Sequence, residues 1–419
     1  MFLGTMRKVL LSALAICVVL LLALSGTASA ASSCAQMKAW LRAGGGSASG
    51  LFVENAETGE VICASAPTTP RPLASNTKLF TTSAALAKIG PETRIPTRLL
   101  TDGTVDAEGV LHGSLYLQGG GDPTLGTPAF YDSYLAGLGT NIFAFVPQLK
   151  KAGIRQVTGR LYGDDTIFDR KRGVADSNYA TSVYIGPLSG LDFNSGFAGA
   201  TSSSHFSSDP AKLATQTLDR SMRRQGIKVG PTIALGKTPA GARQVAVLRS
   251  APLDQIVDTT DVYSDNFFAE MLVKLLGARF GGAGTTAAGT KVSEEFARSM
   301  GSEIHQIDGS GLTYGNEASP QNVVDLLLGV RASTIGEDFI EDLSLAGKDG
   351  TTAGRMKGTP AYGNCRVKTG TLTGVSNLSG LCFDRSGKTM AFSILMAGVG
   401  STEFAHLEQD RIAGAVAGY

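Results

Sequence analysis

The two ends of this sequence show one pattern of expected helices and strands, and the long middle shows another. This division limits the possible fold. Near the start, residues 50–55 and 60–64 alternate in hydrophobicity around a turn, as in an antiparallel hairpin, and a helix is expected from Ser75. Near the end, the pattern predicts three strands and a closing helix, at residues 365–370, 377–383, 389–398 and 402–416. The two ends together predict one α/β domain of the α+β kind, formed by residues 31–92 and 247–419.

The middle, residues 93–246, predicts an inserted accessory region that is rich in β-structure. Short strands such as Gly113–Leu117 and Gly159–Tyr162 alternate there with clusters of turn residues. Two helices fit at Asn141–Ala152 and Pro210–Gln225. A chain of 419 residues has room for this second unit, at about 150 residues per domain.

The first thirty residues have the form of an export signal. Arg7 and Lys8 precede an almost wholly apolar run, Val9–Leu24, and the segment ends in the small residues Ala28-Ser29-Ala30. The run is shorter than the roughly 20 residues that a spanning helix needs. We therefore expect a signal peptide at 1–30 and a protein exported to the periplasm, the cell envelope or the medium. The alternative is an uncleaved segment that keeps the protein associated with the membrane.

Composition excludes some classes of protein. Lys and Arg total 37 and Asp and Glu total 36, so the net charge is +1, which is far from the basic balance that broad nucleic-acid binding requires. The four histidines are scattered, without the spacing of a zinc site. We expect no metal, no organic cofactor and no nucleic acid partner.

The cysteines predict two disulfides. Cys17 lies in the signal, so four cysteines remain, and an oxidising compartment permits them to pair. In an antiparallel register centred near Thr373 and Gly374, Cys365 falls opposite Cys382. This predicts Cys365–Cys382 and leaves Cys34–Cys63. The alternative is four buried free thiols.

Three short motifs could carry chemistry. Ser75 and Lys78 are neighbours on one helical face, and serine becomes a nucleophile when a base is in contact with it. Ser264 and Asn266 lie at the turn that opens a helix expected to end at Gly277, where a hydroxyl can relay a proton and an amide can hold a carbonyl. Each motif also has an ordinary structural interpretation. The first would be a helix cap with an exposed lysine, and the second would be simple N-capping of the following helix.

The third motif is Lys368-Thr369-Gly370-Thr371, at the end of an expected strand. A cation at this place would lower the pKa of a neighbouring lysine and attract a substrate carboxylate. Gly370 permits a ligand to approach the backbone closely. The ordinary alternative is a strand-terminal turn with a solvated lysine.

Together, in the order Ser-x-x-Lys, Ser-x-Asn and Lys-Thr-Gly, these motifs resemble the signature of penicillin-binding proteins and serine β-lactamases. The long insertion between Ser75 and Ser264 is similar to that of class C low-molecular-mass penicillin-binding proteins, the D-alanyl-D-alanine carboxypeptidase/endopeptidase family. The similarity runs from about residue 48 to the C-terminus. Further stretches that match are 117–125, 163–165, 168–169, 264–271, 308–312 and 368–376.

The resemblance implies a penicillin-binding-protein/β-lactamase-like transpeptidase domain and a role for each motif. Ser75 would be the acylated nucleophile, Lys78 its base and Ser264 the proton relay. Asn266 would clamp the substrate amide, and the backbone N–H groups of Ser75 and Thr371 would form the oxyanion hole. The wall that binds the substrate carboxylate would comprise Lys368, Thr369, Gly370 and Thr371.

The sequence departs from the family pattern in two places. The insertion is shorter than in the best-known members, which predicts fewer accessory domains than their usual pair. Where many members have Ser-Arg after the Gly-Leu of the 308–312 stretch, this chain has Thr313-Tyr314. Because that arginine can meet a carboxylate on the third residue of the stem peptide, its absence predicts an amidated or different third residue.

The function that the resemblance implies is an exported serine-type D-Ala-D-Ala carboxypeptidase, DD-endopeptidase, or both. Its substrates would be peptidoglycan stem peptides, and β-lactam antibiotics would act as covalent inhibitors at Ser75. Two alternatives remain open from sequence: a β-lactamase-like hydrolase, and a catalytically inactive cell-wall-binding module.

Overall fold

The computed structural model describes residues 33–199, 205–230 and 232–419. The expected export signal at 1–30 lies outside the described residues. In the part of the chain that is described, none of the helices has the length and apolar character needed to span a bilayer.

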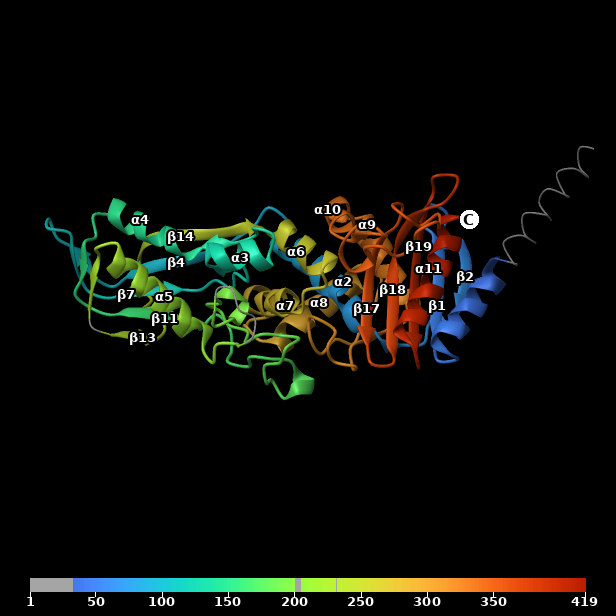
Figure 1. Ribbon diagram of the computed structural model, residues 1–419, viewed down its shortest axis with the longest axis horizontal. Coiled ribbons are helices and arrows are strands. Elements are labelled where there is room, and N and C mark those ends of the chain that lie inside the picture. The colour runs from blue at the N-terminus through green and yellow to red at the C-terminus, as the bar shows by residue number, and fades with distance from the viewer. Residues whose placement is uncertain (1–32, 200–204, 231) are drawn as a thin grey trace, which may run out of the picture.

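A six-stranded antiparallel sheet joins the two ends of the chain (Figure 1). Strand β1, near the N-terminus, pairs with β19 near the C-terminus, from Gly50 opposite Leu395 to Asn55 opposite Met390. Nearly every residue of β18 and β19 is buried, because α11 covers one face and α9 lies on the sheet as well. In order across the sheet the strands are β16 (Ser344–Leu345), β17 (Arg366–Leu372), β18 (Val375–Phe383), β19 (Thr389–Ala397), β1 (Gly50–Asn55) and β2 (Val61–Ser65).

A helical layer lies beside this sheet and occupies the middle of the molecule (Figure 1). Its central member is α2 (Thr77–Ile89), which packs against α6, α7 and α8 and is buried over its first ten residues. Burial on all sides fixes the start of α2, and with it the position of Ser75. The other helices of this half are α6 (Leu253–Val262), α7 (Asn266–Phe280), α8 (Thr286–Ser299), α9 (Pro320–Arg331), α10 (Gly336–Glu341) and α11 (Thr402–Ala417).

The opposite end of the molecule carries two smaller sheets (Figure 1). The first has the order β13 (Ile233–Leu235), β11 (Leu161–Asp164), β7 (Leu115–Gln118), β4 (Arg94–Thr101) and β14 (Arg243–Pro252). The second comprises β12 (Lys228–Val229), β10 (Gln156–Val157), β6 (Val110–His112) and β5 (Thr104–Val105).

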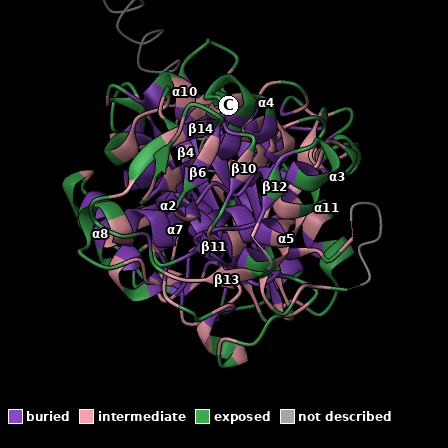
Figure 2. Cartoon of the chain, turned by 90° about the vertical axis from the view of Figure 1, so that its left-hand side faces the viewer, coloured by how far each residue is buried: buried purple, intermediate pink, exposed green. Residues whose placement is uncertain are grey.

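This end has its own apolar core. Side chains of α4 (Phe145–Lys151) and α5 (Pro210–Arg224) pack on the first of the two sheets, and Phe145, Leu161 and Leu218 are completely buried there. Figure 2, which views this end directly, shows buried residues along the strands and exposed residues in the surrounding loops. The chain enters through β4 and leaves through β14, which pair antiparallel, so residue 246 lies inside a strand that continues to Pro252.

The turn between β17 and β18 is tighter than the sequence suggested. The pairing continues to Leu372 opposite Val375, so only Thr373 and Gly374 form the turn, where a loop over 371–377 was expected. Gly374 has a φ of 74°, a left-handed conformation that glycine adopts without strain. As a result, Thr371 belongs to the strand.

Both predicted disulfides are present, Cys34–Cys63 and Cys365–Cys382. The second follows directly from the register, because Arg366 pairs with Leu381 and the two cysteines extend the same ladder. The first ties the helical residues 33–45 to β2 at the far edge of the sheet. The prediction of two disulfides is confirmed.

Removing the Cys34–Cys63 bond with the Cys34→Ala/Cys63→Ala double substitution should lower the free energy of unfolding by about 3–4 kcal/mol. The bond joins residues 29 apart, and it restricts the unfolded chain accordingly. Because β2 is an edge strand and β18, β19 and β1 separate it from β17, we expect the geometry of β17 to stay unchanged. Urea unfolding followed by circular dichroism measures the loss, and a double variant as stable as the parent would contradict the prediction.

Candidate active site

Ser75 and Lys78 are in direct contact at the start of α2. Ser75 lies in a single 3-10 turn, Ala74–Asn76, that leads into the helix. The Lys78 Nζ lies 3.0 Å from the Ser75 Oγ, 2.7 Å from the Asn266 Oδ1 and 2.7 Å from the Ser310 carbonyl oxygen. A neutral amine in this place can donate to Asn266 and Ser310 and accept the proton of Ser75. The geometry therefore suits transfer of a proton from the serine to the lysine.

Burial lowers the pKa of Lys78 and so favours this proton transfer. Its side chain is completely buried, and the cost of burying a charge lowers its pKa to about 8, against the opposing effect of four nearby carboxylates, among them Asp261 and Asp265. An ordinary lysine is almost wholly protonated at neutral pH. Here a useful fraction of the amine is free to act as a base near pH 7 to 8.

The backbone that presents Ser75 is held in an unusual conformation. Ala74 has a φ of 47°, a left-handed conformation that costs a non-glycine residue about 1–2 kcal/mol. Two glycines pack against this turn: a Cβ on Gly311 would lie 1.8 Å from the Ala74 carbonyl oxygen, and one on Gly370 would lie 3.1 Å from the Ser75 nitrogen. Larger residues at 311 or 370 would displace the nucleophile.

Side chains of the sheet fix the same turn. The Asn76 amide donates to the Lys368 carbonyl at 2.9 Å and accepts from the Ser379 hydroxyl at 2.7 Å. The Asn377 amide donates to the Leu73 carbonyl at 2.8 Å. The sequence interpretation assigned no role to these two asparagines. Asn76 lies inside the Ser-x-x-Lys motif, and Asn377 follows the 368–376 stretch. Their closeness in sequence to these motifs was the only feature that could have indicated a role.

Ser264 and Asn266 face the nucleophile from the start of α7. Asp265 caps this helix by accepting from the Phe268 N–H, so neither of its two neighbours is needed as the cap. Ser264 has a φ of 59°, a second strained residue at the site. The Asn266 amide joins two segments, since its oxygen accepts from Lys78 and its nitrogen donates to the Tyr184 carbonyl at 3.1 Å.

Strand β17 forms the third wall. Lys368 is completely buried within it, and its pKa is lowered by burial first and then by the charge of Lys78. The Thr369 hydroxyl is hydrogen-bonded to that of Thr351 at 2.7 Å. Both lysines therefore lie behind the surface that a ligand would touch. The Lys-Thr-Gly segment lies within a strand and does not form the solvated turn of the ordinary reading.

These three walls enclose a cavity of about 280 Å³. It is lined by six of the residues that the sequence suggested and by two that it did not, Thr351 and His406. The six are Ser75, Ser264, Asn266, Thr369, Gly370 and Thr371. Among the described residues, no group of three His, Cys, Asp or Glu side chains is placed to hold a metal ion.

Two buried carboxylates support the loop that contacts Lys78. The Glu270 Oε1 accepts from the N–H groups of Gly309 and Ser310, and burial raises the pKa of Glu270. Asp308 accepts from the N–H groups of Gly311 and Thr313, as expected of a residue that forms a turn. Together they fix the Ser310 carbonyl that accepts from Lys78. Glu270 is a residue that the sequence interpretation missed.

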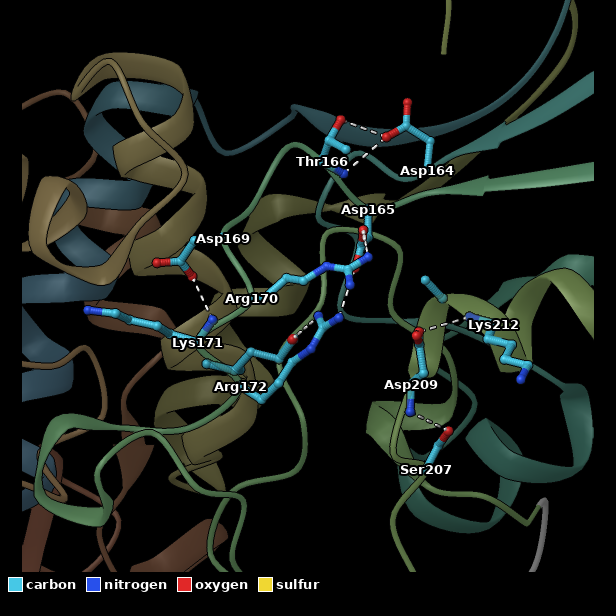
Figure 3. A network of polar contacts seen from close by, with 12 residues as sticks. Asp164, Asp165, Thr166, Asp169, Arg170, Lys171, Arg172, Ser207, Asp209 and Lys212 are labelled. Carbon is cyan, nitrogen blue, oxygen red and sulfur yellow. Dashed lines mark hydrogen bonds and ion pairs between the residues drawn. The ribbon is translucent and has the colours of Figure 1, made fainter. Parts of the chain in front are cut away.

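The segment that follows β11 contacts the site through Tyr184, and polar contacts stabilise its first part, residues 164–172 (Figure 3). Asp165 forms an ion pair with Arg172 at 2.9 Å, and Arg172 also donates to the Leu188 carbonyl. Asp169 forms an ion pair with Lys274, which is completely buried in α7. These contacts hold in place the stretch whose Tyr184 carbonyl accepts from Asn266.

Comparison with known proteins identifies the family. The family model for D-Ala-D-Ala carboxypeptidase 3 (S13) matches residues 35–205 and 197–417. The chain belongs to the S13 family. It is 30% identical over 434 residues to the D-alanyl-D-alanine carboxypeptidase of Actinomadura sp. (strain R39), an alignment that covers 84% of this chain and 78% of that protein. It is 26% identical over 364 residues to the carboxypeptidase DacB of Mycolicibacterium smegmatis, covering 84% and 76%.

Solved structures share the fold. Penicillin binding protein 4 (dacB) from Haemophilus influenzae superposes with a TM-score of 0.78 at 20% sequence identity, covering 91% of this chain and 99% of that one. Its complex with a β-lactam superposes with a TM-score of 0.73 at 19% identity, covering 90% and 99%. The fold class predicted from sequence is confirmed, and this S13 member is a serine D-Ala-D-Ala carboxypeptidase-type hydrolase.

Proposed function

We propose that this chain is an exported DD-peptidase, a carboxypeptidase, an endopeptidase or both, that cleaves peptidoglycan stem peptides through an acyl-enzyme on Ser75. The observation that carries the proposal is the contact of 3.0 Å between the Ser75 Oγ and the amine of a buried lysine, at the wall of a cavity that also holds Ser264 and Asn266. Membership of the S13 family supports the same reaction.

Each residue of the site performs one step of the reaction. The Ser75 Oγ attacks the carbonyl carbon of the penultimate D-Ala and its proton passes to Lys78. The N–H groups of Ser75 and Thr371 stabilise the oxyanion. The C–N bond then breaks, and the departing amine takes a proton delivered through Ser264. Water hydrolyses the ester, which regenerates the Ser75 hydroxyl.

We propose that Lys368, Thr369 and Thr371 together recognise the carboxylate of the departing residue. Thr369 and Thr371 line the cavity and supply hydroxyl donors, while the ammonium of Lys368 lies buried behind them. A carboxylate that enters the cavity raises the pKa of Lys368, because the opposite charge favours the protonated form. Its added charge then favours the neutral form of Lys78.

The rate of acylation should depend on pH through Lys78. Only the neutral amine can accept the Ser75 proton, and its pKa of about 8 lies below the 10.5 of a free lysine. Below pH 8, kcat/KM for acylation by a β-lactam should therefore rise about tenfold per pH unit and then level off. Stopped-flow acylation between pH 5.5 and 9.5 measures this profile, and a rate that is flat across the range would contradict it.

Defined muropeptides test the function itself. The purified protein is incubated with a monomeric pentapeptide and with a cross-linked dimer, and the products are identified by mass spectrometry. Release of D-Ala or of a monomer supports the proposal. Penicillin turnover faster than either release would favour a β-lactamase-like hydrolase, and absence of both turnover and covalent labelling would favour an inactive cell-wall-binding module.

The third residue of the stem peptide should not need a free carboxylate. Tyr314 stands where many S13 relatives would place an arginine, and its hydroxyl donates to the Thr373 carbonyl at 2.9 Å, so no cation is supplied there. We expect amidated stem peptides to be cleaved at least as fast as free-acid ones. Comparing kcat/KM for the two forms checks this, and a tenfold preference for the free acid would contradict it.

We further propose that the protein is exported and that residues 1–30 are removed as a signal. Two disulfides support an oxidising compartment, where such bonds persist. Retention of the segment would instead leave the enzyme associated with the membrane. We also propose that residues 93–246 and the rest of β14 form one accessory unit, because β4 and β14 carry the chain into and out of a separate core.

A further inference from the structure

A second cavity lies next to the candidate active site. It has a volume of about 800 Å³, against 280 Å³ for the active-site cavity, and falls in the range of about 300–1,000 Å³ that is typical of ligand pockets. We call it the α11 cavity. Its walls are the loop 354–359 and the first half of α11, and the residues that matter here are Arg355, Lys357, Phe404, His406, Leu407 and Arg411.

The two cavities share a wall residue. His406 lines both of them. Thr351, on the wall of the active-site cavity, precedes the loop that lines the α11 cavity by only a few residues. The Val399 N–H donates to the Gly374 carbonyl, so α11 begins at the same end of the sheet as the end of β17. Both cavities therefore lie at the same end of β17 and on the two sides of His406.

The α11 cavity combines cations with apolar surface. Arg355 forms an ion pair with Asp410 at 2.6 Å, and its mostly buried side chain forms the floor of the cavity. Lys357 is exposed and has no ion pair within the described residues, and Arg411 pairs only with Glu408, at 2.7 Å. Phe404 and Leu407 are 45% and 47% exposed. Such a surface suits a peptide that carries carboxylates.

The cavity also contains acidic and other titratable groups, and two of its cations are paired with carboxylates. Glu403 and Asp410 also line it, but Asp410 is engaged by Arg355. Burial and the Arg355 charge lower the pKa of His406 to about 4, so its ring is neutral at physiological pH. Arg411 is likewise engaged by Glu408, so Lys357 is the cation of the lining that no described ion pair occupies, and Glu403 is the corresponding carboxylate.

We propose that the α11 cavity binds the leaving strand of a cross-linked substrate, an anionic peptide attached to the amine that Ser75 displaces. The inference rests on the proposed function and extends it. When the leaving group is a single D-Ala, the small cavity is sufficient. When the bond cleaved is a cross-link, the leaving residue is part of a second stem peptide, which continues past Thr351 and His406. The cavity thus favours endopeptidase over carboxypeptidase substrates.

The test compares two activities in one variant. Lys357→Glu reverses an exposed charge, and we expect kcat/KM for a cross-linked dimer to fall about three- to tenfold, mainly through KM. D-Ala release from a monomeric pentapeptide should stay unchanged. Phe404→Ala should show the same selective loss. The matched control is Arg385→Glu, the same reversal in the exposed turn between β18 and β19, at the opposite end of the sheet.

The outcomes separate this inference from the proposed function. Selective loss of dimer cleavage in Lys357→Glu, with a weaker salt dependence than the parent shows, supports the inference. Equal loss of both activities, no loss of either, or a parent that cleaves only the monomer overturns it while leaving the peptidase function standing. A parent that cleaves neither substrate overturns the proposed function itself.

Discussion

Replacing Ser75 with alanine should abolish both D-Ala release and covalent labelling by fluorescent penicillin. The substitution removes the only atom that forms the acyl bond, so we expect the rate to fall by about 10⁴ or more, as is usual when the nucleophile of such a catalytic unit is lost. Stability should change little, because the Ser75 hydroxyl lines the cavity and its loss removes a hydrogen bond with Lys78. Labelling followed by denaturing electrophoresis, with a thermal melt, measures both.

Ser83→Ala is the matched control for this experiment. Ser83 lies on the same helix, and its hydroxyl is hydrogen-bonded to the carbonyls of Leu79 and Phe80, away from the cavity. We expect this variant to label like the parent. If Ser75→Ala were still labelled, another hydroxyl of the cavity would be the nucleophile. Ser264 would be the first to test, and the assignment of roles would have to be exchanged.

Local patterns in the sequence predicted those features that depend on local geometry. The Cys365–Cys382 bond followed from the pairing of two strands across a short turn, because register determines which residues are opposite each other. The contact of Ser75 with Lys78 followed from helical spacing. In both cases the residues concerned are close in the chain, or joined by one hairpin.

Contacts between residues far apart in the sequence could not be predicted from local patterns. The Lys78 amine meets Asn266 and Ser310, which are 188 and 232 positions away in the sequence. Motif order suggested the first of these partners, through resemblance to a family. Ser310 and the buried Glu270 that accepts from its N–H lie in stretches that matched the family, but the sequence assigned neither of them a role. The strained conformation of Ala74 was equally hidden, because alanine is not a residue that signals positive φ.

One expectation failed for a clear physical reason. The helix at α7 was expected to end at Gly277, since glycine commonly ends helices, but it continues to Phe280. Gly277 serves packing instead: a Cβ there would lie 2.6 Å from the Ala283 carbonyl oxygen and 2.8 Å from the Gly289 nitrogen of α8. Tertiary contact has outweighed local preference at this position.

The Lys78→Met substitution should reduce acylation by about 10²–10⁴, the usual contribution of a general base. Methionine keeps the length of the side chain in a fully buried position but cannot accept the Ser75 proton. The residual rate should no longer rise toward pH 8, because the group that titrates there has been removed. Stopped-flow acylation of parent and variant across the same pH range measures both the loss and the change of profile.

Two further variants test whether Lys78 acts as a base or only through its positive charge. Lys78→Arg keeps a cation that does not lose its proton in the accessible pH range, so it should be as slow as Lys78→Met if proton transfer is the role of Lys78. Lys88→Met, an exposed position in the last turn of the same helix, should acylate at the parental rate. If Lys78→Arg kept most of the activity in a folded protein, the lysine would act through its charge alone. The proton of Ser75 would then have to leave by another group, and Ser264, which lines the same cavity, would be the first to test.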